Sequence, residues 1–155
     1  MATELTAQSL TVTITEALSI DHANGETNDI DFAQTYTHTY TSIANVSKRI
    51  IKLANTNVTE IATFGSDTQN GNFVLADIKY IRVTNLDASS TLQVGLDKET
   101  STAEAAYTTI SADSSIIYTT GKLEGTSDGS TMVDATALKV KGAANQQLEI
   151  FIASA

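Results

Sequence analysis

Apolar and polar residues alternate along much of this chain. In Leu10–Ile14 the apolar residues occupy every second position, and threonines fill the positions between them. In Thr35–Thr41 a tyrosine or a histidine alternates with threonine in the same way. Successive side chains of a β-strand point to opposite faces of the sheet, so this period of two predicts half-buried strands with a threonine face turned to water.

The alternation recurs to the end of the chain, interrupted by turn residues. Asn24-Gly25 and Asn70-Gly71 supply the positive φ angles of tight turns. The polar stretch 97–106 is the only helix candidate; it lacks an apolar stripe and is expected to be a loop or one helical turn. The last two strands are expected to form a hairpin around Gly142–Ala144. About ten strands are predicted, over residues 10–14 with an extension to 20, 30–43, 46–54, 58–64, 78–85, 92–96, 107–110, 115–119, 137–141 and 147–153.

Many short strands with frequent turns predict an all-β fold. An antiparallel β-sandwich is expected, and a jelly roll is one arrangement that fits. The 155 residues suit a single such domain over residues 10–155, preceded by an N-terminal arm over residues 1–9. Charged residues and proline, which protect sheet edges, are sparse on most strands, so we expect another copy of the chain to cover some edges.

The charge balance argues against two classes of partner. The chain has a net charge of −9 at pH 7, and its nine lysines and arginines are scattered. Such a surface repels phosphate backbones and anionic membranes. No apolar run approaches the ~20 residues that span a bilayer, and residues 1–10 do not have the pattern of a signal peptide. We therefore expect a protein made in a reducing cytoplasm that binds neither nucleic acid nor membrane.

Residues suited to catalysis or metal binding are few. The chain has no cysteine, and neither His22 nor His38 lies in a nucleophile or phosphate-binding motif. The acidic stretch Asp21–Asp31 offers Ca²⁺ ligands, but its spacing does not match a known calcium loop, and solvated turn residues are the expectation there. We expect no enzymatic activity, no cofactor and no bound metal.

Sugar binding is an alternative function that the tyrosines suggest. Lectin-like sandwiches stack sugar rings on exposed aromatic side chains. Tyr36, Tyr40, Tyr107 and Tyr118 are the candidates, although aromatic residues make up only 6% of the chain and tryptophan is absent. This alternative requires these tyrosines to be exposed and clustered.

A short internal repeat concerns structure. The run Ile51–Asn55 resembles Ile81–Asn85, and a glycine follows each asparagine after ten residues, at Gly65 and Gly95. Hairpins of similar build converge on similar residues, and a duplicated hairpin is the alternative explanation. Neither explanation indicates a binding site.

The segment Ile78–Leu96 carries a resemblance to a known class of proteins. Its sequence IKYIRVTNLDASSTLQVGL resembles a pattern in small structural proteins of tailed bacteriophages, where an alternating strand ending in asparagine is followed by a strand ending in VGL or LGL. The resemblance covers about residues 78–153, with the strand 115–119, the loop 121–136 and the strand 147–153 in the corresponding places. The chain departs from that pattern before Ser115, where it offers only Ser111–Asp113 as a turn.

The resemblance implies a structural role in the virion. Such sandwiches serve as capsid decoration (cement) proteins or as tail and fibre components. We expect a homotrimer that binds the major capsid protein or other virion proteins and bridges capsomers at three-fold sites. The expected contacts lie on the long loops and on the N-terminal segment, where free chain reaches neighbours most easily, at Ala2, Thr3, Glu4, Leu5 and Leu10.

Overall fold

The computed structural model describes residues 8–20, 30–65, 73–97, 106–119 and 135–155. The chain divides into two compact units, Met1–Ser42 and Ile43–Ala155. This division differs from the expected boundary after residue 9, because the first two strands pair only with each other. The alternating sequence pattern predicts that these strands belong to the sandwich. However, the pattern indicates only which residues share a face of a strand, and it does not indicate what covers that face.

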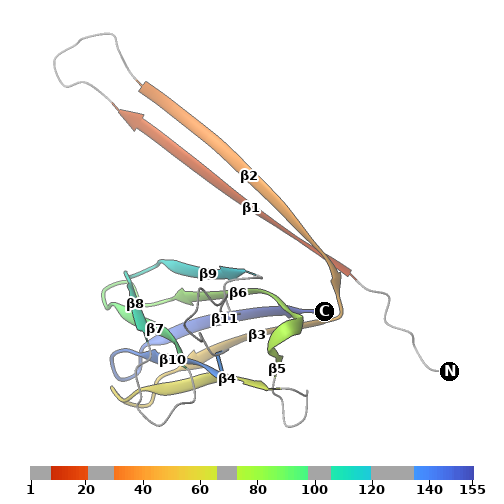
Figure 1. Ribbon diagram of the computed structural model, residues 1–155. Coiled ribbons are helices and arrows are strands. Elements are labelled where there is room, and N and C mark those ends of the chain that lie inside the picture. Colours follow the sequence, from red (N-terminus) through yellow and green to blue (C-terminus); the bar gives the residue numbers. More distant parts are fainter. Residues whose placement is uncertain (1–7, 21–29, 66–72, 98–105, 120–134) are drawn as a thin grey trace, which may run out of the picture. The chain divides into compact units, whose positions relative to one another are not determined.

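The first unit contains a two-stranded sheet, drawn as a long ribbon in Figure 1. Its strands are β1 (Gln8–Ile20) and β2 (Ile30–Ile43), and β2 ends with the first residue of the second unit. Threonine and other β-branched residues favour extended backbone, which fits strands of this length. We call this two-stranded sheet the ribbon.

The second unit is a β-sandwich, which confirms the predicted all-β class. Its four-stranded sheet has the order β3-β11-β6-β9, and its five-stranded sheet has the order β5-β4-β10-β7-β8 (Figure 1). All pairings are antiparallel except that of β4 with the short β5. The elements are β3 (Asn45–Lys52), β4 (Thr59–Gly65), β5 (Phe73–Val74), the 3₁₀ helix η2 (Leu75–Asp77), β6 (Ile78–Asn85), β7 (Leu92–Asp97), β8 (Ala106–Ile110), β9 (Ser115–Thr119), β10 (Ala137–Lys141) and β11 (Gln147–Ser154).

The strand order is that of a jelly roll. The pairs β3 and β4, β6 and β7, β8 and β9, and β10 and β11 each contribute one strand to each sheet, and the four pairs follow the same order in both sheets. In this arrangement β3, the first strand of the sandwich, pairs with the last strand β11, and β4 pairs with β10, as in a jelly roll built of two Greek keys. The expected hairpin of the last two strands is wrong, because β10 and β11 lie in different sheets. Each has a buried row, and the two rows face each other across the core.

The four connections within these pairs, 53–58, 86–91, 111–114 and 142–146, lie at one end of the sandwich. The long connections, 66–77, 98–105 and 120–136, join strands at the opposite end. Most of their residues, including most of the helix candidate at 97–106, lie outside the described residues.

The core lies between the sheets and consists of aliphatic side chains. Ile81, Val83 and Ile150 of the four-stranded sheet and Leu138 and Val140 of the five-stranded sheet are completely buried. These residues occupy the apolar positions of the alternating sequence pattern. Burying such side chains stabilises the fold by about 1.5–3 kcal/mol each.

Two buried amides fix the end of the sandwich where the short connections lie. The side chain of Gln146 donates from Nε2 to Asn85 Oδ1 at 2.9 Å, and its Oε1 accepts from the Ala143 backbone N–H at 2.7 Å. The Asn85 amide donates to the carbonyls of Ser90 and Ser111. Three connections are thereby tied together through side chains that water does not reach.

The internal repeat has a structural counterpart. Asn55 Oδ1 accepts from the Asn57 backbone N–H at 2.8 Å, and Asn85 Oδ1 accepts in the same way from Asp87 at 3.2 Å. Each asparagine thus makes the same side-chain turn, at the point where the chain crosses from the four-stranded to the five-stranded sheet. The repeated element is therefore a crossing between sheets, and the hairpin interpretation is wrong.

Candidate functional site

The sequence-predicted contact residues fall mostly outside the described part of the chain. Ala2, Thr3, Glu4 and Leu5 lie there, and their role stays a prediction. Leu10 lies in β1 and is partly buried. His22 and nearly all of the acidic stretch that follows it also lie outside the described residues.

The four candidate sugar-stacking tyrosines are distributed over three sheets. Tyr36 and Tyr40 lie on β2, Tyr107 on β8 and Tyr118 on β9. Tyr118 packs against the sandwich core, and this burial raises its pKa. Tyr107 is partly buried and lies directly opposite Gly95 of β7. It lies on a different sheet from each of the other three tyrosines.

One face of the ribbon is a ladder of threonines. The hydroxyl pairs Thr11 with Thr39, Thr13 with Thr37 and Thr15 with Thr35 lie 3.2, 3.4 and 3.4 Å apart, and all six side chains are exposed. Cross-strand threonine pairs of this kind contribute modestly to a sheet, about 0.2–1 kcal/mol each. They also fix the register of the two strands.

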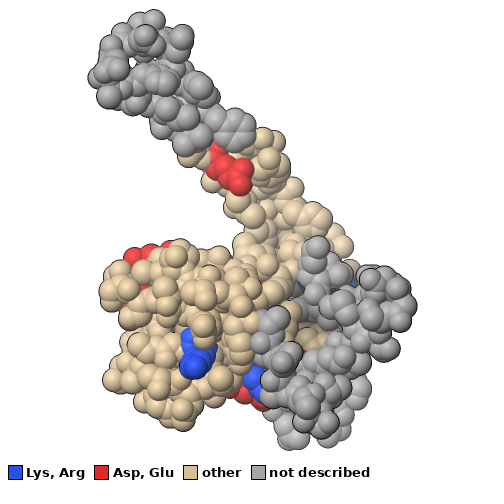
Figure 2. All heavy atoms as spheres, turned by 60° about the vertical axis from the view of Figure 1, so that its left-hand side comes forward, with Lys and Arg blue, Asp and Glu red and all other residues tan. Residues whose placement is uncertain are grey.

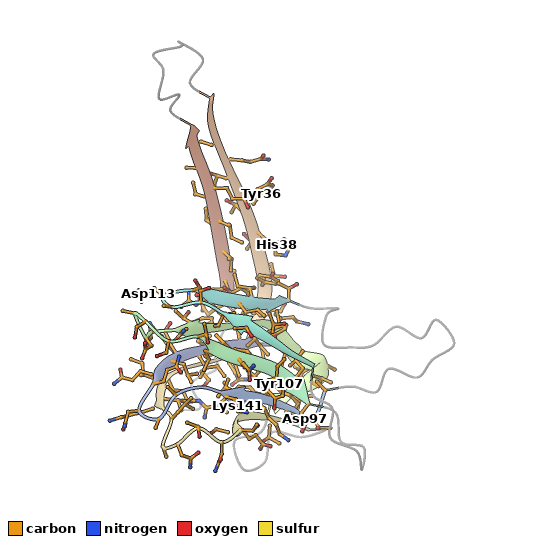
Figure 3. The ribbon with its side chains drawn as sticks, turned by 90° about the vertical axis from the view of Figure 1, so that its left-hand side faces the viewer. Tyr36, His38, Asp97, Tyr107, Asp113 and Lys141 are labelled. Carbon is orange, nitrogen blue, oxygen red and sulfur yellow. The ribbon has the colours of Figure 1, made fainter. Side chains whose placement is uncertain are left out.

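That register defines the opposite face. Since Thr11 lies opposite Thr39 and Thr13 opposite Thr37, the pair between them is Val12 with His38. Tyr36 and His38 project from the same side of β2 (Figure 3). The rows on this side join Leu10 with Tyr40, Val12 with His38, and Ile14 with Tyr36. We call the surface made by these six side chains the apolar ribbon face.

The apolar ribbon face is accessible to water within the single chain. Tyr36 is 51% exposed and Ile14 is 45% exposed, and the two side chains lie in one row. The rings of His38 and Tyr40 pack edge to face with centroids 4.4 Å apart, which holds them on the surface of the strand. A row of aromatic and aliphatic side chains of this kind is a candidate interaction site.

Charge is scarce around this surface. Within the described strands of the ribbon, Glu16 and Asp31 are the only acidic residues, and lysine and arginine are absent. On the face of the molecule that Figure 2 shows, charged side chains are few and most of the described surface is uncharged. The apolar ribbon face therefore offers apolar contacts and little electrostatic attraction to a charged partner.

The outer side of the four-stranded sheet carries an ion-pair network. Glu149 of β11 contacts Arg82 of β6 at 2.6 Å and Lys48 of β3 at 3.2 Å. Partial burial raises the pKa of Glu149, but the hydrogen bonds and charges of Arg82 and Lys48 outweigh this effect and hold that pKa below its ordinary value. The network joins three neighbouring strands of the sheet.

A second ion pair joins Lys139 of β10 to Asp97 of β7 on the five-stranded sheet. The hydrogen bond to Asp97 raises the pKa of Lys139. The described ranges hold no group of three or more histidine, aspartate or glutamate side chains placed to share a metal ion. Among the same residues, no helix has the length and apolar character that crossing a membrane requires.

Comparison with known proteins adds no relative. No family model, no curated protein and no solved structure matches this chain.

Proposed function

We propose that this protein is a structural protein of a tailed-bacteriophage virion, a head decoration (cement) protein that acts as a homo-oligomer and stabilises the shell by bridging capsomers. A trimer at three-fold positions is the form we expect. The major capsid protein would be its main partner.

The observation that carries the proposal is the exposure of the apolar ribbon face. Two strands that pair only with each other are marginally stable in water, because neither face can be buried. Here Ile14 and Tyr36 stay about half exposed in the single chain. A ribbon of this kind is stabilised when another surface covers it, which is the requirement of a protein built to assemble.

The sandwich is compatible with the same role. Jelly rolls occur in viral capsid proteins and in lectins, and this fold-level analogy raises the expectation without deciding it. The edge strands β8 and β9 contain no charged residue, and no described strand pairs with their outer edges, so these edges permit strand addition by a neighbour. The resemblance of Ile78–Leu96 to phage structural proteins points in the same direction.

A direct test is to locate the protein in purified virions. Particles released from cells that carry the gene would be labelled with an antibody against the purified chain and viewed by electron microscopy. Regular labelling of the heads is the expected result. Virions without the protein, detected by mass spectrometry of the washed particles, would overturn the proposal.

The alternative is a tail or fibre module that binds glycans. Tyr36 favours it, because this half-exposed ring shares a surface with Tyr40. Labelling confined to tails, together with glycan-array binding that Tyr36→Ala abolishes, would support this alternative. An absence of glycan binding on the array would count against this alternative. Tyr118 could not replace Tyr36 as the sugar-stacking residue, because it packs against the core.

A further inference from the structure

We propose that the apolar ribbon face binds the same face of a second copy of this chain. The inference deepens the proposed function, on which it rests, by naming a surface through which two copies meet; the expected trimer would need a second kind of contact, because a contact of one face with the same face closes at two copies. The inference concerns the protein in solution. It can therefore fail while the virion assignment stands, and the virion assignment can fail while the contact between copies stands.

The chemistry of the face favours another copy as its occupant. Its three rows, Leu10 with Tyr40, Val12 with His38, and Ile14 with Tyr36, contain no formal charge when the histidine is neutral. The whole chain carries a net charge of −9 at pH 7, so two copies repel each other over most of their surface. An uncharged apolar strip is where such copies can approach, whereas a basic partner would select acidic side chains that these rows lack.

The position of Glu16 is consistent with this pairing. It follows Ile14 on the same side of β1, one row beyond the apolar rows, and it is exposed. Two copies can therefore meet over the three apolar rows while the two carboxylates remain at the margin in water. Like charges buried opposite each other would oppose association.

The area that two copies can bury on this face is modest. Aromatic side chains have about 150–250 Å² to bury, but in each copy Tyr36 and Ile14 are about half exposed and Leu10, Val12 and Tyr40 are already partly buried. Two such faces together bury several hundred Å² at roughly this exposure, less than the ~1,000 Å² of a standard interface, so the contact is expected to be weak and to depend on concentration. A symmetric contact also places the same patch on both partners, as most soluble homo-oligomers do.

Cross-linking tests this proposal on the full-length chain. The chain has no cysteine, so single cysteines report one position each. Val12→Cys places a thiol in the middle of the apolar ribbon face, and Thr13→Cys, the matched control, places one on the threonine face of the same strand. Each variant would be treated with a short bismaleimide at low concentration, after circular dichroism has verified the fold.

The proposal predicts that Val12→Cys shifts to covalent dimers, the largest species that one thiol per chain allows, and that Thr13→Cys stays uncross-linked. Equal cross-linking of both variants would overturn it, because the contact would then not be specific for one face. So would a Val12→Cys protein that stays monomeric. In that case the reaction of the thiol with a monofunctional maleimide would show what covers the face. A thiol that reacts would indicate an exposed face that serves a different partner, and a thiol that does not react would indicate that other residues of the same chain cover it.

Discussion

At the scale of single residues, the buried amides of Asn85 and Gln146 stand out. Both are almost completely inaccessible to water, and hydrogen bonds satisfy both. Buried polar groups of this kind contribute modestly when paired but are costly when a partner is removed. Their removal therefore tests whether the short connections depend on each other.

Gln146→Leu keeps the approximate size of the side chain and removes both of its polar atoms. The Ala143 N–H loses its partner, and Asn85 Oδ1 loses one of its two donors. We expect the free energy of unfolding to fall by about 1–3 kcal/mol, measured by urea titration. The matched control Gln147→Leu changes an exposed neighbour and should have little effect. Equal effects of the two variants would refute the structural role of the network.

The ion pairs of Glu149 predict a pH dependence of stability. Its folded-state pKa is depressed, so the stabilisation is present above the unfolded-state pKa of about 4.3 and is lost as the pH falls through the folded-state pKa. Glu149→Gln should lower the stability at pH 7 by roughly 1 kcal/mol, and its difference from the wild type should shrink on acidification.

Thermal melts followed by circular dichroism between pH 7 and pH 3 measure this difference. The control Glu16→Gln alters an exposed carboxylate of the ribbon and should leave the melting of the sandwich unchanged at each pH. A wild type and a Glu149→Gln variant that stay equally far apart down to pH 3 would contradict the account.

The sequence identified some of these residues and missed others. Asn85 was noticed as the end of a strand motif, but its buried position depends on Gln146, which is far away in sequence. Gln146 gave no local signal, because a glutamine beside an exposed Gln147 looks like a surface residue. Gly142, which lies beside Gln146 in the structure, was predicted only as a turn residue. A Cβ on Gly142 would lie 2.2 Å from Gln146 Oε1, so the missing side chain makes room for the amide.

At the scale of elements, the strands followed from the alternation and their partners did not. The predicted strands 78–85, 92–96 and 115–119 are present almost as expected. Alternation indicates which side chains share a face, but the choice between a hairpin and a crossing to the opposite sheet depends on distant strands. For that reason the last two strands were wrongly paired, and the ribbon was wrongly placed within the sandwich.

The separation into two units predicts that the sandwich folds without the ribbon. Its core side chains, such as Ile81, Leu138 and Ile150, all come from the second unit. A chain of residues 43–155 should therefore unfold cooperatively on heating, as followed by circular dichroism. A peptide of residues 8–42 should lack strand structure at low concentration, because an isolated two-stranded sheet is marginal. A shortened chain that fails to fold would show that the sandwich needs the ribbon.

At the scale of the whole molecule, an acidic chain carries a nearly uncharged apolar surface on its ribbon. The sandwich buries most of its apolar side chains between two sheets and leaves others, such as Val46 and Ile50 on either side of Lys48, exposed, whereas the ribbon presents Ile14 and Tyr36 to water in one row. The sequence indicated an assembly protein through its bare strand edges and named the N-terminal segment as the contact. The structure directs attention a few residues further along, to a surface that becomes visible only when the register of β1 and β2 is known.

The most direct test is the solution mass of the full chain, measured by light scattering on a sizing column over a concentration series. We predict a species whose mass is a multiple of 16.4 kDa. Ile14→Glu, which places a charge on the apolar ribbon face, should reduce it to the monomer, while Val58→Glu, at a 47% exposed position of the sandwich, should leave it assembled. A wild-type mass of 16.4 kDa at every concentration, or an assembly that Val58→Glu dissociates and Ile14→Glu does not, would contradict the account.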